Sequence, residues 1–348
     1  MVRKFKVKKC SKNKKIFLCI GGSFLTFVLS FIFLLYGPYD GFRNFWITTS
    51  MTTMSHQYLA KWFYSDEVIQ KVLAMNEVIE SKENTNTNLV KIKKYGRNMK
   101  VYKNKYEEQI LKKDKDNDLY KVIEINGTGY KGYLVAIYDP SKVSLATSRY
   151  IGTRGEAITT VAKNEDAVIA INAGGFYDPD WNSNGGVPHG VVISNGKLIG
   201  DYRKANVGGG IVGFDKDNKL VLGRYSAQEA LKKGIRDCVE FGPYLIVNGK
   251  SSFVRGNGGW GIAPRTAIGQ RKDGIVLFLI INGRIPSSIG ADMSDLTEVM
   301  ENYGAVNAAN MDGGSSTELV IHNEIINKPV AAGKNGLRDL PTFWIVKE

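Results

Sequence analysis

The sequence predicts an α+β or mixed α/β fold: a large mixed β-sheet with a few helices, preceded by one transmembrane helix. From about Leu119 to the end of the chain, short apolar runs alternate with glycine, which is typical of strands joined by tight turns. Asn195-Gly196 and Asp273-Gly274 stand between such runs, where two-residue hairpin turns belong, and Asn248-Gly249 marks another turn. Helical patterns are few here, so strands dominate the predicted layers.

The N-terminus combines a basic tail with an apolar segment. Residues 1–15 carry eight of the basic residues and no acid, against a net charge of +13 for the whole chain. Residues 16–36 are 21 uncharged positions, a helix of about 31 Å, which matches the hydrocarbon core of a bilayer. A secretory signal is the alternative, but its apolar part usually has about 7–15 residues and a small-x-small cleavage site follows it. We expect an uncleaved single-pass signal anchor in the cell membrane, with residues 37–348 extracellular because the basic tail stays inside.

Charge and cysteine usage narrow the class of protein. Because most of the excess charge lies in the tail, the basic composition does not indicate a nucleic-acid partner. Cys10 and Cys19 lie in the tail and the span, which leaves Cys238 without an intramolecular disulfide partner. We expect Cys238 to be a small buried side chain on a strand.

Residues 37–118 predict a linker that is partly helical and partly flexible. Ser65 is a plausible N-cap, and apolar residues recur at helical spacing from there to about Glu80. A polar run and a Lys-rich stretch follow, up to Asp118. The predicted organisation is therefore a basic tail (1–15), a membrane anchor (16–36), a linker (37–118) and a catalytic-type domain (119–348).

Strands and helices of the domain follow from these patterns. Strands are expected at 121–125, 132–138, 143–147, 168–172, 189–193, 198–201, 210–214, 219–222, 238–247, 264–269, 275–282, 305–311, 316–321 and 341–346. Helices are expected near 156–163, after the Ser226 and Glu229 capping box, and from about Ser294 to Tyr303 with Gly304 as its end.

The stretch 305–321 is the strongest candidate for chemistry. An apolar run leads into Asp312, and Gly313 and Gly314 follow at once, before a strand that begins at Glu318. Glycines permit backbone angles closed to other residues and let a ligand approach the main chain. A capped hairpin turn without catalytic function is the alternative interpretation.

Five glycine-rich segments together resemble the phosphodiester glycosidase family. The resemblance covers roughly residues 130–348, and its segments are 171–180, 185–197, 240–250, 263–269 and 311–318. Asn172, Gly174 and Gly175 match an Asn-Gly-Gly-Phe-Phe element with Ala173 inserted or substituted, and residues 265–269 match Arg-Thr-Ala-Ile-Gly. Residues 310–315 match Asn-Leu-Asp-Gly-Gly-Gly, with Ser315 in place of the third glycine, and Asn282 stands where the family has Asp.

The resemblance implies a hydrolase that cleaves between a sugar's anomeric carbon and a phosphodiester. A phosphate monoester leaves as a stabilised anion, since its second pKa is near 6, so Arg265 is the candidate to neutralise it. Asp312 is the candidate nucleophile or base at the sugar carbon, and His189 can donate to the phosphate or to a hydroxyl. The candidate substrate-binding residues are Asn172, Gly174, Gly175, Asn310, Gly313, Gly314, Ser315 and Thr317.

Weaker candidates complete the site prediction. Glu240, Asp292 and Glu318 are other carboxylates, of which Glu318 is expected to alternate with Thr317 and face solvent. The run Asp180-x-Asn182-x-Asn184-Gly185 fits the first half of a calcium loop, but Val191 stands where the closing Glu belongs. Trp181 in this loop is a candidate to stack on a sugar. We therefore expect no metal and no cofactor, with a polar loop at the rim of the site as the default.

Motifs for other hydrolases are absent from the sequence. No G-x-S-x-G, S-x-x-K, H-E-x-x-H, Walker A or Cys-pair zinc spacing occurs. Two functions stay open at this stage. One is a membrane-anchored extracellular glycosidase acting on sugar phosphodiesters in cell-wall or exopolysaccharide material; the other is a non-catalytic surface module that binds phosphate-bearing glycans during cell-wall or spore-coat assembly.

Overall fold

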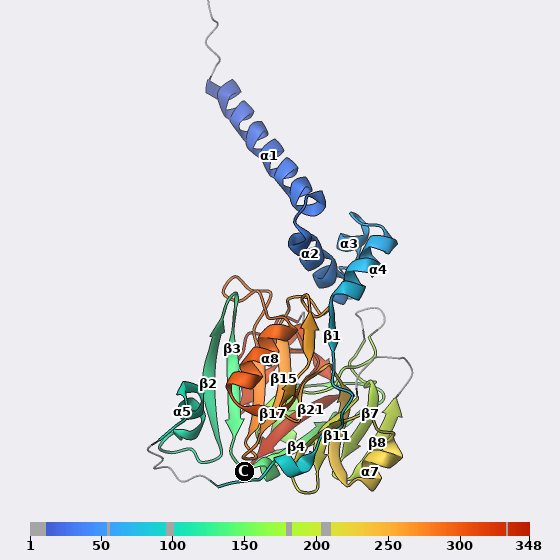
Figure 1. Ribbon diagram of the computed structural model, residues 1–348, viewed down its shortest axis with the longest axis vertical. Helices are drawn as coiled ribbons and strands as arrows, with labels where there is room; N and C mark the ends of the chain where they lie inside the picture. Colours follow the sequence, from blue (N-terminus) through green and yellow to red (C-terminus); the bar gives the residue numbers. More distant parts are fainter. Residues whose placement is uncertain (1–11, 54–55, 95–100, 179–182, 203–209, 332) are drawn as a thin grey trace, which may run out of the picture.

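The computed structural model describes residues 12–53, 56–94, 101–178, 183–202, 210–331 and 333–348. The strands of these ranges form three larger sheets with helices on their outer faces, which confirms the α+β class (Figure 1). The strands are distributed over several sheets instead of one, and their pairings in the described ranges are antiparallel.

The seven-stranded sheet has the order β13-β12-β17-β15-β16-β3-β2. Its strands are β13 (Lys250–Ser251), β12 (Tyr244–Val247), β17 (Ala305–Asn310), β15 (Arg265–Arg271), β16 (Val276–Ile281), β3 (Tyr130–Ile137) and β2 (Tyr120–Gly127). β16 is buried along its whole length and reads as a continuous apolar run, as expected for a strand covered on both faces.

Two five-stranded sheets complete the body of the domain. One has the order β10-β9-β11-β7-β8, from β10 (Leu220–Gly223), β9 (Gly210–Asp215), β11 (Ile235–Phe241), β7 (Gly190–Ser194) and β8 (Lys197–Tyr202). The other has the order β19-β18-β6-β21-β4, from β19 (Glu324–Ile325), β18 (Leu319–Ile321), β6 (Ala167–Asn172), β21 (Thr342–Lys347) and β4 (Val143–Thr147). Short pairs join β1 (Glu77–Ile79) to β14 (Phe253–Arg255) and β20 (Asp339–Leu340) to β5 (Glu156–Ala157).

The core lies between the three sheets. Phe214, Phe278 and Trp344 come from different sheets and are fully buried in one cluster, where each such side chain contributes about 1.5–3 kcal/mol on burial. The outer faces are covered by α6 (Ile158–Asn164), α7 (Ala227–Lys232) and α8 (Met293–Asn302), while α5 (Lys105–Leu111) packs beside β2.

The predicted helix caps and tight turns are confirmed. The Ser65 side chain accepts from Val68 at the start of α4 (Asp66–Met75), and the Ser226–Glu229 capping box starts α7. Asn195, Gly196, Asn248 and Gly249 have positive φ, as the predicted tight turns require. Cys238 is buried in β11, as expected.

Three expected elements are wrong in extent. The strand at 238–247 is two strands, β11 and β12, because the chain leaves one sheet after Phe241 and enters another at Tyr244. The strand at 316–321 begins only at Leu319, since residues 314–316 form a 3-10 turn. The helix expected to reach Glu80 ends at Met75, because Glu77–Ile79 instead pairs with β14.

The N-terminal helices form a separate small cluster next to the sheets. α1 (Lys12–Tyr36) projects from the domain, followed by α2 (Asp40–Thr52), α3 (Tyr58–Lys61) and α4 (Figure 1). By length and composition, residues 16–36 of α1 are able to cross a membrane, and only 6% of the most apolar window is buried. Leu35 at the end of α1 is buried with Ile47, Ile69 and Val72, so we call α2–α4 and the end of α1 the helical cluster.

The segment after the helical cluster lies along the domain. Lys91 and Lys93 donate main-chain bonds to the carbonyls of Lys272 and Asp273, at 2.8 and 2.9 Å, and Thr85 donates to Leu222 at 2.9 Å. This part of the predicted flexible linker is therefore fixed to the sheets, while the domain boundaries themselves stay a prediction.

Candidate active site

Asp312 lies where the chain crosses from one sheet to another. β17 ends at Asn310 in the seven-stranded sheet, and β18 belongs to a five-stranded sheet, so the alternative of a plain hairpin is wrong. The Asp312 N–H donates to the Ala173 carbonyl at 3.1 Å, and the Gly314 N–H to that of Pro264 at 2.8 Å. Gly314 has φ +62°, a conformation that glycine adopts without strain. Both sheets therefore fix the position of the carboxylate.

A pocket of about 250 Å³ surrounds Asp312. It gathers seven of the predicted site residues: Asp312, Arg265, His189, Gly175, Gly313, Gly314 and Ser315. These residues come from the ends of β15 and β17, from the segment after β6 and from the residue before β7. Because one end of each large sheet contributes to the wall, side chains distant in sequence meet here.

Gly175 allows two sheets to approach closely at the pocket wall. A Cβ built on Gly175 would lie 2.7 Å from Phe241 and 3.3 Å from the His189 ring. A larger residue would displace both side chains, so this glycine shapes the pocket and does not itself bind through a side chain.

Asn172 lies behind the pocket and supports the Asp312 turn. Its Nδ2 donates to the Asp312 carbonyl at 2.6 Å, and its Oδ1 accepts from Thr266 Oγ1 at 2.7 Å and from the Glu318 N–H at 3.2 Å. The side chain is 1% exposed. Asn172 therefore positions Asp312, in place of the predicted contact with sugar hydroxyls.

Replacing Asn172 with alanine is expected to destabilise the fold by about 3 kcal/mol. Three buried polar groups would lose their hydrogen-bond partner. Each loss costs ~1–3 kcal/mol, and the expected total is the lower end of their sum. Urea unfolding of the full chain in detergent measures this loss. Asn126→Ala, at an exposed strand position, is the control and should change stability by less than ~0.5 kcal/mol. An equal effect of both substitutions would contradict the positioning role.

Gly174, Asn310 and Thr317 are also outside the pocket lining. A Cβ on Gly174 would lie 3.1 Å from Val239, so this glycine serves packing. Asn310 is 1% exposed and donates to the Gly242 carbonyl at 2.9 Å. Thr317 is likewise buried, at 1% exposure. The three residues belong to the support of the pocket wall.

Arg265 is buried and tied to three carbonyls. Its Nε donates to Ala291 at 3.1 Å, while Nη2 donates to Gly261 at 2.6 Å and to Trp260. Nη1 has no hydrogen-bond partner among the described residues and lies near Gly313. Burial lowers the pKa of Arg265 to about 10, and the nearby Arg284 also lowers it. The guanidinium is thus charged at neutral pH and keeps one edge for a ligand.

Two further arginines line the pocket that the sequence did not identify as site residues. Arg338 is bonded to Asp178, donates through Nη1 to Ser315 Oγ at 3.3 Å and lies 4.6 Å from the centre of the Phe176 ring. Arg284 is exposed and lines the pocket beside Gly314. Apart from the Arg338–Asp178 pair, two guanidinium groups face one carboxylate, which leaves a net positive pocket.

The carboxylates differ in protonation. Burial raises the pKa of Asp312 to about 6, while hydrogen bonds from Ser316 and Gly313 and the charge of Arg338 oppose the shift. Burial raises the pKa of Glu318 to about 8, so Glu318 is protonated at pH 7. Glu318 is fully buried, and its expected exposure to solvent is wrong because β18 is covered on both sides. Of these two carboxylates, Asp312 lines the pocket and is mainly ionised at pH 7.

His189 lies at the pocket wall as a half-buried side chain. The main-chain N–H of His189 donates to the Gly175 carbonyl at 2.8 Å, which fixes the residue just before β7. Burial lowers the pKa of the imidazole, so the ring is neutral at pH 7 and can either donate or accept a hydrogen bond.

Apolar and hydroxyl groups form the remaining wall. Phe241 and Trp260 lie with their ring centres 6.2 Å apart and both line the pocket. Thr52 and Thr53, from the end of α2, line it as well. The sequence placed these two threonines in the linker and gave no signal for their contact with the site.

The weaker candidates have structural roles. Glu240 accepts from the Val191 N–H at 3.1 Å, and Asp292 caps α8 in a capping box with Asp295. Asn282 is buried outside the pocket lining and accepts from the Lys328 N–H at 2.8 Å. Asp180, Trp181 and Asn182 lie outside the described residues. No group of three or more His, Cys, Asp or Glu side chains within the described ranges could hold a metal.

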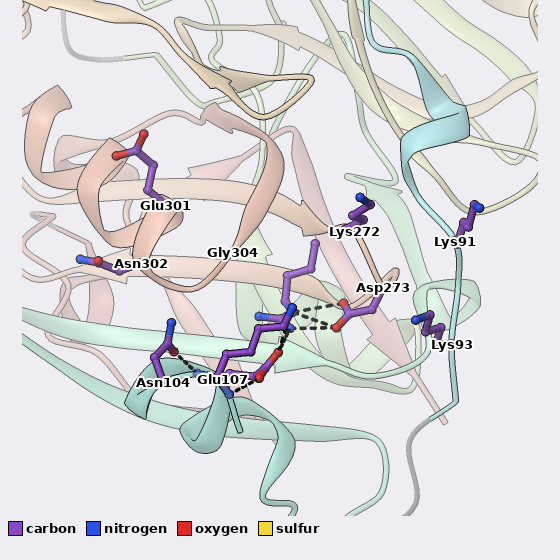
Figure 2. A pocket seen from close by; sticks show the side chains of 11 residues that line it. Lys91, Lys93, Asn104, Glu107, Lys272, Asp273, Glu301, Asn302 and Gly304 are labelled. Atoms are coloured by element: carbon purple, nitrogen blue, oxygen red, sulfur yellow. Dashed lines mark hydrogen bonds and ion pairs between the residues drawn. The ribbon is translucent and has the colours of Figure 1, made fainter. Parts of the chain in front are cut away.

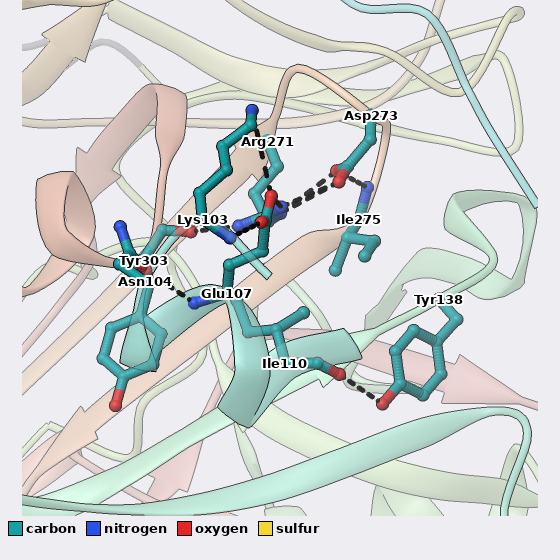
Figure 3. Close-up of polar contacts among 9 residues, drawn as sticks. All are labelled: Lys103, Asn104, Glu107, Ile110, Tyr138, Arg271, Asp273, Ile275 and Tyr303. Carbon is teal, nitrogen blue, oxygen red and sulfur yellow. Dashed lines mark hydrogen bonds and ion pairs between the residues drawn. The ribbon is translucent and has the colours of Figure 1, made fainter. Parts of the chain in front are cut away.

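A second hollow, of about 310 Å³, lies at the opposite end of β15 from Arg265 and is lined by exposed lysines (Figure 2). Its buried charges are used within the fold: Arg271 donates to Asp273 at 2.8 Å and to the Tyr303 carbonyl at 2.7 Å, and lies 3.9 Å from Glu107 (Figure 3). Tyr138 in the same view donates to the Ile110 carbonyl at 2.7 Å. These contacts therefore attach α5 to the sheet. The hollow has no group comparable to Asp312.

Comparison with known proteins gives a family match to the same region. The family model described as phosphodiester glycosidase matches residues 165–347. A relative from Bacillus subtilis strain 168, the SPbeta prophage-derived uncharacterized protein YomE, is 34% identical over 199 residues. The match covers 55% of this chain and only 30% of that relative.

One solved structure shares the fold of this chain, and another is similar over part of its length. The catalytic domain of zebrafish N-acetylglucosamine-1-phosphodiester alpha-N-acetylglucosaminidase, auto-inhibited by its pro-peptide, superposes with a TM-score of 0.55 at 20% identity, covering 68% of this chain and 85% of that chain. A protein from Burkholderia pseudomallei K96243 has a TM-score of 0.45 at 17% identity, with 63% and 74% of the two chains covered.

Proposed function

Because this chain belongs to the phosphodiester glycosidase family, we propose that the Asp312 pocket hydrolyses the bond between a sugar's anomeric carbon and a phosphodiester oxygen. The observation that carries this proposal is the meeting of Asp312 with Arg265, Arg284 and Arg338 in one pocket. Water adds to the anomeric carbon as the bond to the phosphate oxygen breaks. The products are a reducing sugar and a phosphate monoester.

The arginines suit the departing phosphate. A phosphate monoester has a second pKa near 6, so it leaves at neutral pH with little need for a general acid. What the step requires is neutralisation of the charge that develops on the phosphate oxygens. Guanidinium groups provide this through paired N–H donors, and the open Nη1 of Arg265 and the exposed Arg284 are placed to do so.

Asp312 suits the sugar side of the reaction. The anomeric carbon passes through an oxocarbenium-like state that an ionised carboxylate stabilises, either as nucleophile or as base for water. Asp312 is ionised above pH ~6, while Glu318 stays protonated at pH 7. His189 is neutral and can bond to a phosphate oxygen or a sugar hydroxyl.

The apolar wall suits a single sugar ring. Phe241 and Trp260 present carbon surface beside the charged groups. The volume of about 250 Å³ lies below the roughly 300–1,000 Å³ of pockets for drug-sized ligands. We therefore assign the pocket to one sugar and its phosphate, with the rest of the substrate outside.

The proposed location of the reaction rests on α1. We propose that residues 16–36 anchor the chain in the cell membrane with the domain on the extracellular side, and that the substrate is phosphate-bearing cell-wall or exopolysaccharide material. The length and apolar surface of α1 and the basic residues before it support this placement.

The test is turnover by the full chain in detergent. Methyl phosphodiesters of the 1-phosphates of N-acetylglucosamine, glucose and galactose are incubated with it, and free reducing sugar is measured. Release from at least one diester is expected. Binding of these diesters without any release would overturn the proposal and favour the non-catalytic glycan-binding module.

The pH dependence of this release is a separate prediction. Because burial raises the pKa of Asp312 to about 6 and the ionised form acts, kcat/KM should fall about tenfold per pH unit below pH ~6 and level off above it. Initial rates between pH 4.5 and 8 measure the profile. A plateau that extends down to pH 4.5 would contradict Asp312 as the titrating group.

A further inference from the structure

The helical cluster brings the end of the apolar helix close to the pocket. α1 ends at Tyr36, and α2 begins at Asp40 and ends at Thr52, where it forms part of the pocket wall. A helix of this length spans about 20 Å. Figure 1 shows α2 between α1 and the sheets, and the end of α2 lines the pocket, so the pocket lies on the side of the domain that carries α1.

Contacts within the helical cluster fix α1 to it. Tyr64 donates through its hydroxyl to the Leu35 carbonyl at 2.8 Å, and Tyr36 donates to the Phe63 carbonyl at 2.8 Å. Leu35 is 1% exposed, and the rings of Phe31 and Trp46 meet edge to face at 5.5 Å. The helix thus ends in a packed structure and not in a free hinge.

Further contacts fix the helical cluster to the pocket wall. Asn257 donates to Thr48 Oγ1 at 2.6 Å. A Cβ built on Gly261 would lie 2.7 Å from the Thr49 Cα, so α2 rests directly on that glycine. The Gly261 carbonyl also accepts from Arg265 at 2.6 Å. The distance from the end of α1 to Arg265 is therefore set by a continuous series of packed groups.

Exposed aromatic side chains lie at the end of α1 and on the helical cluster. Tyr36 and Tyr39, at the end of α1, are 60% and 55% exposed, and Trp62 of the helical cluster is 71% exposed beside Tyr58. Tyr and Trp are enriched at the interface between membrane and water. With residues 16–36 in a bilayer, these side chains would lie in the headgroup region and the pocket just above it.

We propose that, within the phosphate-bearing cell-wall or exopolysaccharide material, the substrate is a glycosyl phosphodiester whose phosphate is esterified to a membrane lipid, and that the pocket takes it from the membrane in which α1 is anchored. This inference rests on the proposed hydrolase function. Water adds to the anomeric carbon and the bond to the phosphate oxygen breaks. The sugar is released to water, and the lipid phosphate monoester stays in the bilayer. A phosphate held at the headgroup level is within reach of a pocket fixed at that height.

The experiment compares three presentations of one sugar to the full chain in phosphatidylcholine–phosphatidylglycerol vesicles. The sugar is the one whose methyl phosphodiester is hydrolysed best in detergent. It is offered as its phytanyl phosphodiester in the same vesicles, as that lipid in separate vesicles, and as the soluble methyl diester, with Asp312→Asn as the blank. We expect release from the lipid in the same vesicles to be at least tenfold faster than from the other two.

Equal rates from the three presentations would overturn the lipid-linked substrate and leave the hydrolase function intact. No release from any diester, in detergent or in vesicles, would overturn the hydrolase function and this inference with it. The two failures are therefore distinguishable.

A double variant tests the position of the helical cluster at the bilayer. Tyr58→Ser combined with Trp62→Ser should lower the rate ratio of the same-vesicle lipid to the methyl diester at least threefold, with the methyl diester rate unchanged. Val101→Ser is the matched control, because Val101 is 81% exposed and shortly precedes α5, an element that Figure 1 shows away from α1. Equal ratios in the double variant and the control would overturn this position.

Discussion

Asp312→Asn is expected to lower kcat/KM for a sugar 1-phosphodiester by about 10²–10⁴-fold, the range for loss of a positioned acid–base group. Asparagine keeps the shape of the side chain and an oxygen that can accept from the Gly313 N–H, now at 3.0 Å. It removes the negative charge that faces the anomeric carbon. The rate of sugar release from the methyl diester measures the loss.

The thermal stability of the Asp312→Asn variant distinguishes a catalytic role of Asp312 from a structural one. The folded-state pKa of Asp312 is raised above its unfolded value of 3.8, so folding favours the protonated form. The stabilisation is present below pH ~4 and is lost as the pH rises through ~6. Asp312→Asn should therefore unfold at a temperature no lower than the wild type at pH 7. A large loss of both activity and melting temperature would contradict the assignment.

The local elements were predictable because each depends on a few neighbouring residues. Asn195-Gly196 and Asn248-Gly249 form tight turns with positive φ at all four residues, and the Ser226–Glu229 capping box is complete within one helical turn. The Asp312 turn was found for the same reason, since a carboxylate followed by two glycines is a local pattern. Its crossing between two sheets was not predictable, because that depends on which distant strands pair.

The same dependence on distant parts of the chain explains the wrong and missing residues in the predicted site. Asn172 resembled a sugar ligand, but its partners Asp312 and Thr266 lie 140 and 94 positions away and occupy its amide. Arg338 follows no recognisable motif and reaches the pocket through its bond to Asp178, 160 positions earlier. Thr52 joins the wall only because α2 packs on Gly261. Each of these contacts is set by tertiary packing.

Arg265→Lys is expected to lower kcat by about 10²–10³-fold, which is the cost of losing one preorganised donor to a developing negative charge. Arg265 donates through Nε and Nη2 to the carbonyls of Ala291, Trp260 and Gly261. Its Nη1 lies toward Gly313. Lysine keeps the charge but has a single ammonium group, which cannot hold the carbonyls and the phosphate at once. Its three donors are expected to stay with the buried carbonyls.

Arg271→Lys is the matched control, because Arg271 lies at the other end of β15 and is also buried, at 8% exposure against 4% for Arg265. Its guanidinium bonds to Asp273 and the Tyr303 carbonyl, away from the pocket. Both variants lose paired hydrogen bonds and should lose similar stability in urea unfolding, yet only Arg265→Lys should lose turnover. If the two variants retained the same kcat, Arg265 would be a structural residue, and the phosphate would depend on Arg284 and Arg338 for its charge neutralisation.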